Sequence, residues 1–171
     1  MAAEREDLQY RGHRIVANDS GAMIYPDKHS IVGESIQANL KAAKSWVDQK
    51  YRNRHVNRRE PHIGTVDDFL EAFTALPLGD HETAMLTAHK KAPGHRLTAT
   101  QLSESAGWQD AGPANLHYGY LGRRVSEQLG LPLTENDGRA WTEALAEYDD
   151  DTNEWILYPE AVEALEKLNI G

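Results

Sequence analysis

The chain has 171 residues, of which 27 are acidic and 18 basic, a net charge of −9, and no cysteine. This length suffices for one domain or two small ones, and the lack of cysteine excludes disulfides and thiolate chemistry. No apolar run approaches the roughly 20 residues of a membrane span, and the N-terminal sequence MAAEREDLQY is charged where a signal peptide would be apolar. We therefore expect a soluble, cytoplasmic protein that does not contact membranes.

The N-terminal part predicts a small βββα unit. Three short segments have the composition of strands, and the turn signals Asp19-Ser20-Gly21 and Pro26-Asp27 separate them. A helix follows, and its apolar face consists of Ile36, Leu40, Ala43 and Val47. The sequence YRGHRI, a second strand pair and AAKSWVD make this part similar to a short domain of phage and mobile-element proteins. The predicted strands are residues 8–16, 22–25 and 30–33, and the predicted helix is residues 35–51.

Basic side chains crowd the end of this helix, in KAAKSWVDQKYRNRHVNRREPH. Such a stretch suits phosphates or an acidic partner. The alternative is a solvated helix end that leads into a linker, because cations are favourable at a helix C-terminus. The cations that we expect to contact nucleic acid here are Lys41, Lys44, Lys50, Arg52, Arg54, Arg58 and Arg59.

A domain boundary is expected near Pro61, at the end of a polar segment. Residues 1–60 hold 11 Lys and Arg against 8 Asp and Glu, whereas residues 61–171 hold 7 against 19. The two parts therefore have net charges of +3 and −12. We predict a βββα unit with a basic helix end and linker at residues 1–60, and an acidic winged-helix-like domain at residues 61–171.

The second part opens with two predicted helices, and a helix-turn-helix follows them. Thr98 and Gln101 have the spacing of a capping box, and Gly107 is placed for a left-handed C-cap. Pro113 lies in the first turn of the next helix, which Gly130 closes. Because residues 141–158 then alternate like a two-stranded hairpin, the expected fold class is α+β, with a mostly helical winged helix-turn-helix domain after the N-terminal unit.

Helical spacing divides residues 113–129 into two faces. The buried stripe should be Tyr118, Leu121, Val125 and Leu129, and the outward face Asn115, Gly119, Arg123 and Ser126, flanked by His117, Tyr120 and Arg124. Asn can bond an adenine edge, Arg a guanine edge, and Gly lets the backbone approach phosphates. This pattern is typical of a recognition helix, although an ordinary helix with solvated Arg123 and Arg124 gives the same pattern. The residues expected to contact nucleic acid here are Asn115, His117, Tyr120, Arg123 and Arg124.

The predicted hairpin, or wing, carries acids where a DNA-reading wing usually carries cations. Four acids fall within six residues at its tip, and phosphates would repel them. Either the wing points away from DNA or the partner is not DNA. A cation-binding loop is an alternative, but the spacing lacks the glycine and terminal glutamate of an EF-hand, and a solvated acidic turn is simpler. The acids expected to bind a basic partner are Glu147, Asp149, Asp150, Asp151 and Glu154.

Residues 80–170 resemble a domain found in bacterial HNH-type endonuclease proteins of the modification-dependent restriction kind. The most specific part of the resemblance is ANLHYGYLGR, residues 114–123, together with TATQLSESAG before it and the Trp-containing segment after it. In that family this domain lies beside the nuclease module. The resemblance implies an accessory or DNA-reading role.

Catalytic motifs are not found in this sequence. An HNH nuclease needs a ββα-metal unit with a water-activating His, and the eight histidines here lie apart, without HExxH. His81, His89 and His95 come nearest to a ligand set, but spacings of eight and six do not share a helix face. We expect no metal, no cofactor and no enzymatic activity.

Two functional hypotheses follow, of which the first is preferred and the second is the alternative. In the first, the chain is a non-catalytic DNA-binding protein, linked to restriction or phage defence, in which the helix at residues 113–129 reads double-stranded DNA and the basic stretch holds the backbone. In the second, it is an anti-CRISPR or anti-restriction protein of phage type, whose acidic C-terminal half binds a basic nucleic-acid channel of a host protein. No coiled-coil seam predicts an oligomeric state, so the sequence leaves it open.

Overall fold

The computed structural model describes residues 4–133 and 138–171, and the chain divides into two compact units. The first unit ends at Val56 and the second begins at Asn57, a few residues before the predicted boundary. Residues 57–60 belong to the second unit because the side chain of Arg58 is buried there. None of the helices in the described ranges combines the length and the apolar character that a bilayer-spanning segment needs.

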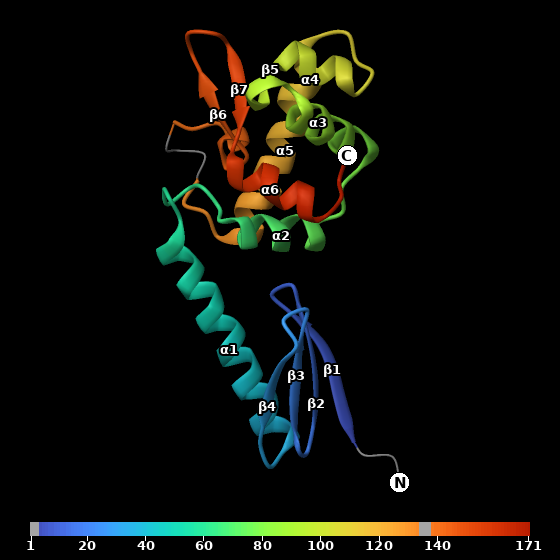
Figure 1. Cartoon of the computed structure of the whole chain (residues 1–171), viewed down its shortest axis with the longest axis vertical. Helices are drawn as coiled ribbons and strands as arrows, with labels where there is room; N and C mark the ends of the chain where they lie inside the picture. The colour runs from blue at the N-terminus through green and yellow to red at the C-terminus, as the bar shows by residue number, and fades with distance from the viewer. Residues whose placement is uncertain (1–3, 134–137) are drawn as a thin grey trace. The chain divides into compact units, whose positions relative to one another are not determined.

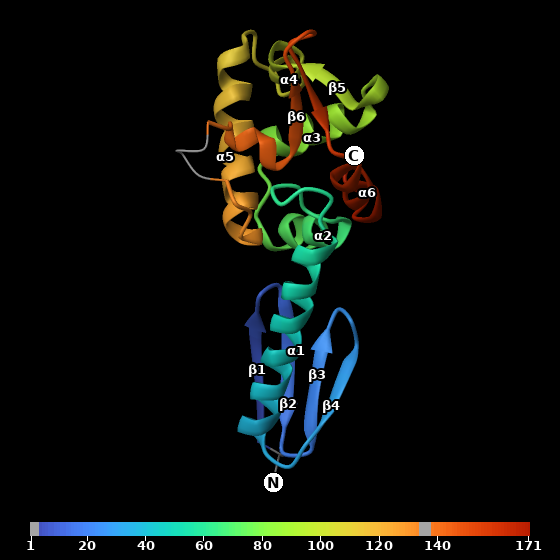
Figure 2. The same ribbon diagram turned by 90° about the vertical axis from the view of Figure 1, so that its left-hand side faces the viewer.

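The first unit is a four-stranded antiparallel sheet with one face covered by a helix (Figure 2). The predicted βββα order is wrong in one respect, because the segment expected as a single strand is two strands joined by a tight turn. Arg11 and Gly12 form this turn with φ angles of 47° and 75°, a conformation that favours glycine. The elements are β1 (Arg5–Tyr10), β2 (His13–Asn18), β3 (Gly21–Tyr25), β4 (His29–Val32) and α1 (Ile36–Asn57).

The core of the first unit lies between this sheet and α1. Ile15 on β2 and Ile24 on β3 are cross-strand partners and are fully buried. The predicted apolar face of α1 is confirmed at Leu40, Ala43 and Val47, which pack into the same cluster. Strand order β1-β2-β3-β4 joins only consecutive strands, so the sheet is a simple meander.

The second unit is mainly helical, with a small antiparallel sheet of strand order β5-β7-β6. Helix α5 is its longest helix among the described residues, and α2, α3, α4 and α6 lie around it (Figure 1). The β6–β7 hairpin is called the wing below. The elements are α2 (Val66–Ala75), α3 (Asp80–Lys91), η1 (Pro93–His95), β5 (Arg96–Thr98), α4 (Ala99–Ser105), α5 (Ala111–Leu129), η2 (Trp141–Ala144), β6 (Ala146–Asp149), β7 (Glu154–Leu157) and α6 (Pro159–Lys167).

The helix ends of the second unit confirm the predicted signals. Thr98 accepts a hydrogen bond from the backbone of Gln101, whose side chain bonds back, so the capping box is present. Gly107 and Gly130 follow α4 and α5 with φ angles of 88° and 60°, as left-handed C-caps require. Asp110 begins α5 by accepting from the Gly112 N–H at 2.9 Å.

The core of the second unit forms around the predicted buried stripe of α5. Tyr118, Leu121, Val125 and Leu129 are all buried, as predicted. Ser126 was predicted to face outward, which is wrong, because only 2% of it is exposed. At the end of α5 the Leu131 N–H donates to the Ser126 carbonyl at 2.9 Å.

A buried histidine joins three elements of this core. His89 on α3 has no exposed surface, and its Nδ1 lies 2.9 Å from the Tyr118 hydroxyl on α5. Its Nε2 lies 2.9 Å from the Trp155 carbonyl on β7. Because a carbonyl can only accept, Nε2 carries the hydrogen and Nδ1 accepts from the tyrosine. Burial lowers the pKa of His89 to about 4, so the ring is neutral near pH 7.

The helix η2 packs directly onto α5 at a glycine. A Cβ atom on Gly122 would lie 2.1 Å from the Trp141 carbonyl oxygen, whereas one on Gly119 would come no closer than 3.9 Å to Thr142. We expect Gly122→Ala to lower the free energy of unfolding by about 1–3 kcal/mol, because the backbone of η2 must shift. Gly119→Ala is the matched control and should be neutral or stabilising, since alanine is the better helix former. Equal midpoints for the two variants in urea unfolding would contradict this packing.

Candidate binding surface on helix α5 and the wing

The exposed side of α5 is a mixture of apolar and charged side chains. Leu116 and Tyr120 lie one helical turn apart with 52% and 55% of their surfaces exposed. Arg123 and Glu127 continue this exposed side toward the C-terminal end of α5 and form an ion pair at 2.9 Å. Asn115 is also exposed near the start of α5. The helix thus brings together Asn115, Tyr120 and Arg123 of the predicted nucleic-acid face, with an unpredicted leucine among them.

Gly119 is half-buried on the side of α5 that lies next to η2. Its Cβ direction points toward Thr142 of η2, and the neighbouring Gly122 lies under the Trp141 carbonyl. The guanidinium of Arg123 also lies 5.5 Å from the centre of the Trp141 ring. One flank of the exposed side is therefore closed by η2.

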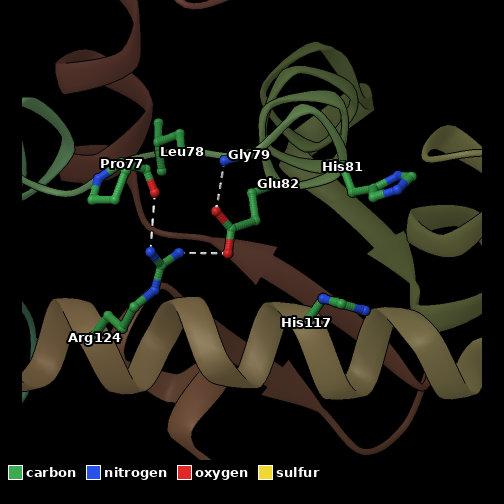
Figure 3. Close-up of a pocket in the computed structure, with 7 residues that line it drawn as sticks. All are labelled: Pro77, Leu78, Gly79, His81, Glu82, His117 and Arg124. Carbon is green, nitrogen blue, oxygen red and sulfur yellow. Dashed lines mark hydrogen bonds and ion pairs between the residues drawn. The ribbon is translucent and has the colours of Figure 1, made fainter.

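A pocket of about 390 Å³ lies along the other flank of α5, facing the segment that joins α2 to α3. Figure 3 shows Arg124 reaching from α5 to Glu82, with Pro77 beside them. The guanidinium donates to the Pro77 carbonyl at 3.0 Å and to the Glu82 carboxylate at 2.5 Å. Glu82 in turn accepts from the Gly79 N–H at 3.0 Å. Arg124 thus ties α5 to the start of α3, and its charge is already paired.

Three aromatic rings meet at the start of α5. His117 stacks on Trp108, with ring centres 4.9 Å apart and an interplanar angle of 15°. His81 lies on the other side of the pocket from Arg124, as Figure 3 shows, and its ring centre is 4.4 Å from that of Trp108. The Nδ1 atom of His81 lies 3.2 Å from the Ala106 carbonyl, so this nitrogen carries a hydrogen. These contacts make His117 part of a packed aromatic cluster.

The predicted basic stretch does not form one cationic surface. Arg54 is buried at the end of α1, and Lys50 forms an ion pair with Asp27. Arg52 is exposed and donates to Gln49, while Lys44 lies 5.5 Å from the centre of the Tyr10 ring. Lys41 is exposed.

Arg58 and Arg59, the last two residues of the basic stretch, lie in the second unit and differ in burial. Arg58, whose side chain is 2% exposed, donates to Asp68 at 2.9 Å and to the Leu129 carbonyl at 3.0 Å. Arg59 is exposed and donates from two nitrogens to Glu160. This hydrogen bonding raises the pKa of Arg59. Burial removes Arg54 and Arg58 from the set of side chains that a phosphate could reach.

The acids of the wing have two different environments. Asp149 accepts from Arg96 on β5 at 2.8 Å and from the N–H groups of Asp151 and Thr152 in the turn. Arg96 also lies 3.4 Å from Glu154. The bond from Arg96 is the main cause that lowers the pKa of Asp149. Asp149 therefore holds the turn, and both Asp149 and Glu154 pair with Arg96, whereas Glu147, Asp150 and Asp151 stay exposed.

A second pocket, of about 500 Å³, lies beside the wing. Carboxylates dominate its charged lining. The hydroxyl of Tyr158 donates to the Glu143 carbonyl at 2.9 Å, and burial raises the pKa of this tyrosine. The polar and aromatic lining residues include Glu60, Glu143, Glu147, Asp150, Tyr148, Tyr158, Arg59, Arg139 and His62.

Cations of the second unit are largely engaged within it. Residues 57–171 contain nine Lys and Arg against 20 Asp and Glu, a net charge of −11. Seven of the nine form ion pairs with acids of the same unit, and Lys90 donates to the carbonyls of Ile170 and Gly171. Exposed carboxylates remain in surplus over the surface. The paired cations are Arg58, Arg59, Arg96, Arg123, Arg124, Arg139 and Lys167.

The chain matches no family model, no curated protein and no solved structure in comparisons with known proteins. Within the described ranges, no cluster of three or more His, Cys, Asp or Glu side chains could hold a metal ion. The surface of the second unit is therefore the basis for the function proposed below.

Sequence reasoning missed two features of this surface. Leu116 was not named, although an exposed leucine one turn before Tyr120 on the outward side of a helix is visible in the spacing alone. The pairing of Arg124 with Glu82 joins residues 42 positions apart, and no local pattern indicates it.

Proposed function

We propose that the chain is a non-catalytic binding protein whose acidic second unit engages a basic surface of a protein partner. The main support for this proposal is that the cations of the second unit are already paired. Eight of nine in the second unit are already bonded to acids or carbonyls of that unit, and exposed carboxylates remain in excess. Such a surface attracts a cationic partner and repels phosphates.

The partner chemistry that fits best is a cationic channel that normally holds DNA or RNA. Channels of this kind present many Lys and Arg side chains, so an acidic protein competes directly with the nucleic acid. Glu147, Asp150 and Asp151 on the wing are the acids free to contact it. In this proposal the protein acts as an anti-restriction or anti-CRISPR protein.

A second candidate is DNA reading by α5, and the order of elements favours it. Helix, strand, helix-turn-helix and hairpin follow one another in α3, β5, α4, α5 and the wing, which is the order expected of a winged helix-turn-helix. Asn115 and Tyr120 are exposed on α5. Against this candidate stands the pairing of both Arg123 and Arg124 with glutamates.

Fluorescence anisotropy separates the two candidates. The probes are a labelled arginine-rich peptide and a labelled mixed-sequence duplex, unmodified and cytosine-methylated, titrated from low to physiological salt. We expect the peptide to bind in a salt-dependent manner and the duplex to remain unbound at physiological salt. Glu147→Gln, Asp150→Asn and Asp151→Asn together should weaken peptide binding about tenfold or more, because three charges near the contact are lost.

The matched control neutralises three exposed acids elsewhere in the same unit, through Asp67→Asn, Glu104→Gln and Glu166→Gln. This control carries the same change in net charge and should weaken peptide binding much less. Equal losses of peptide affinity in the two triple variants would mean that only net charge matters. The wing would then not be the binding site. Salt-sensitive binding of the duplex, lost in Arg123→Gln, would replace the proposal with the second candidate.

A further inference from the structure

We infer that the exposed pair Leu116 and Tyr120 on α5 is a docking surface for an apolar face of a basic, amphipathic helix of the partner. This inference rests on the proposed function and adds to it a specific contact and the chemistry of its occupant. The net negative charge of the second unit explains why a cationic partner is attracted, but it does not fix where the partner docks. A specific apolar contact would fix that position.

The two side chains stand out from the rest of the second unit. In its described residues, Tyr148 is the only other exposed large hydrophobic side chain, at 39%. Leu116 and Tyr120 exceed half exposure and are neighbours at positions i and i+4. The core beneath them is closed, since Tyr118 and Leu121 on the same helix are 1% and 0% exposed. The core is therefore complete without Leu116 and Tyr120, and these two apolar side chains remain available to a partner.

Helix α5 holds this pair in a fixed position. Ser103 accepts from the Ala114 N–H at 3.0 Å at the start of the helix. Gly122 lies against the backbone of η2, and Arg124 binds Glu82 on α3. The helix is thus anchored on the turn before and the turn after the pair. A partner that docks here has no ordering cost to overcome in the helix backbone.

Charge selects the occupant. Arg123, which is exposed on the same helix, is bonded to Glu127 and lies over Trp141. A second copy of the chain would bring another unit of net charge −11 against the first, which is repulsive. A basic partner is attracted by the same negative charge. A helix is the shape that fits, because the row of side chains at i and i+4 packs into the groove of a facing helix.

The experiment uses the full chain and two labelled synthetic peptides of identical Leu and Lys composition. One has leucines at helical spacing on a single face, and the other has them alternating, so that no helical face forms. We expect the chain to bind the helical peptide more tightly. Leu116→Ala with Tyr120→Ala should weaken that binding about tenfold or more, as expected for a central apolar contact, and should leave binding of the alternating peptide unchanged.

The matched control removes two exposed apolar side chains of the first unit, through Tyr25→Ala and Val32→Ala, and should change neither affinity. Unchanged binding of the helical peptide in the Leu116 and Tyr120 variant would overturn the inference. If the wing variant weakens both peptides while the Leu116 and Tyr120 variant weakens neither, the proposed function stands and the docking surface does not. Light scattering tests the remaining occupant, since a dimer that the Leu116 and Tyr120 variant converts to monomer would assign the surface to a second copy.

Discussion

Replacing Arg58 by methionine is expected to lower the free energy of unfolding of the second unit by about 3–5 kcal/mol. Its side chain and that of Asp68 are 2% and 0% exposed. The loss of the guanidinium leaves the Asp68 carboxylate inside the protein without the bond from Arg58, and it frees the Leu129 carbonyl from its donor. Breaking one partner of a buried pair is costly because the remaining charge stays desolvated.

Arg59 offers the control for this experiment in the next position of the chain. It also donates to a carboxylate, that of Glu160, but its side chain is 53% exposed. Water solvates both charges after Arg59→Met, so we expect a loss below about 1 kcal/mol. Urea unfolding of both variants gives the comparison. Similar losses in the two variants would show that the buried pair has no special role.

Acid is expected to destabilise the second unit through His89. The pKa of this histidine is about 4 in the folded protein, whereas an unfolded histidine titrates near 6.5. The unfolded chain therefore binds the proton first as the pH falls. The stabilisation is complete above the unfolded pKa and is lost as the pH falls from about 6.5 to 4, to a total of about 3 kcal/mol.

The variant His89→Gln isolates this contribution. A glutamine amide can still donate to the Trp155 carbonyl and accept from Tyr118, but it binds no proton. Between pH 7 and pH 4 the natural chain should lose about 3 kcal/mol more than the variant in urea unfolding. The difference between the two chains matters, because carboxylates elsewhere also titrate in this range. Parallel pH profiles would contradict the assignment.

Local signals of the sequence predicted much of the second unit. Thr98 with Gln101, Gly107 and Gly130 mark helix ends through bonds or backbone angles that involve near neighbours, so spacing alone indicates them. The buried stripe of α5 follows from helical periodicity for the same reason. The extra strand in the first unit was missed because Arg11-Gly12 is a weak turn signal, although the inward positions change phase there, from Leu8 and Tyr10 to Ile15 and Ala17.

The candidate site was less predictable, because charge partners lie far apart in the chain. Arg58 belongs to a basic run that is typical of an exposed surface, and only the tertiary structure reveals its pairing with Asp68. The sequence predicts Arg124 as a solvated cation at the edge of the outward face, whereas the structure pairs it with Glu82. Periodicity assigns a side chain to a face, but it does not say which other element covers that face.

The strand order of the two sheets has a consequence for how fast each unit forms. Every strand of the first sheet pairs with the next one along the chain, so each hairpin closes over a short loop. The second unit must instead bring β5 to β7, with Arg96 opposite Ile156, and Arg58 to Leu129. Because folding slows as contacts become more distant in sequence, the meander should assemble first and the second unit should follow it.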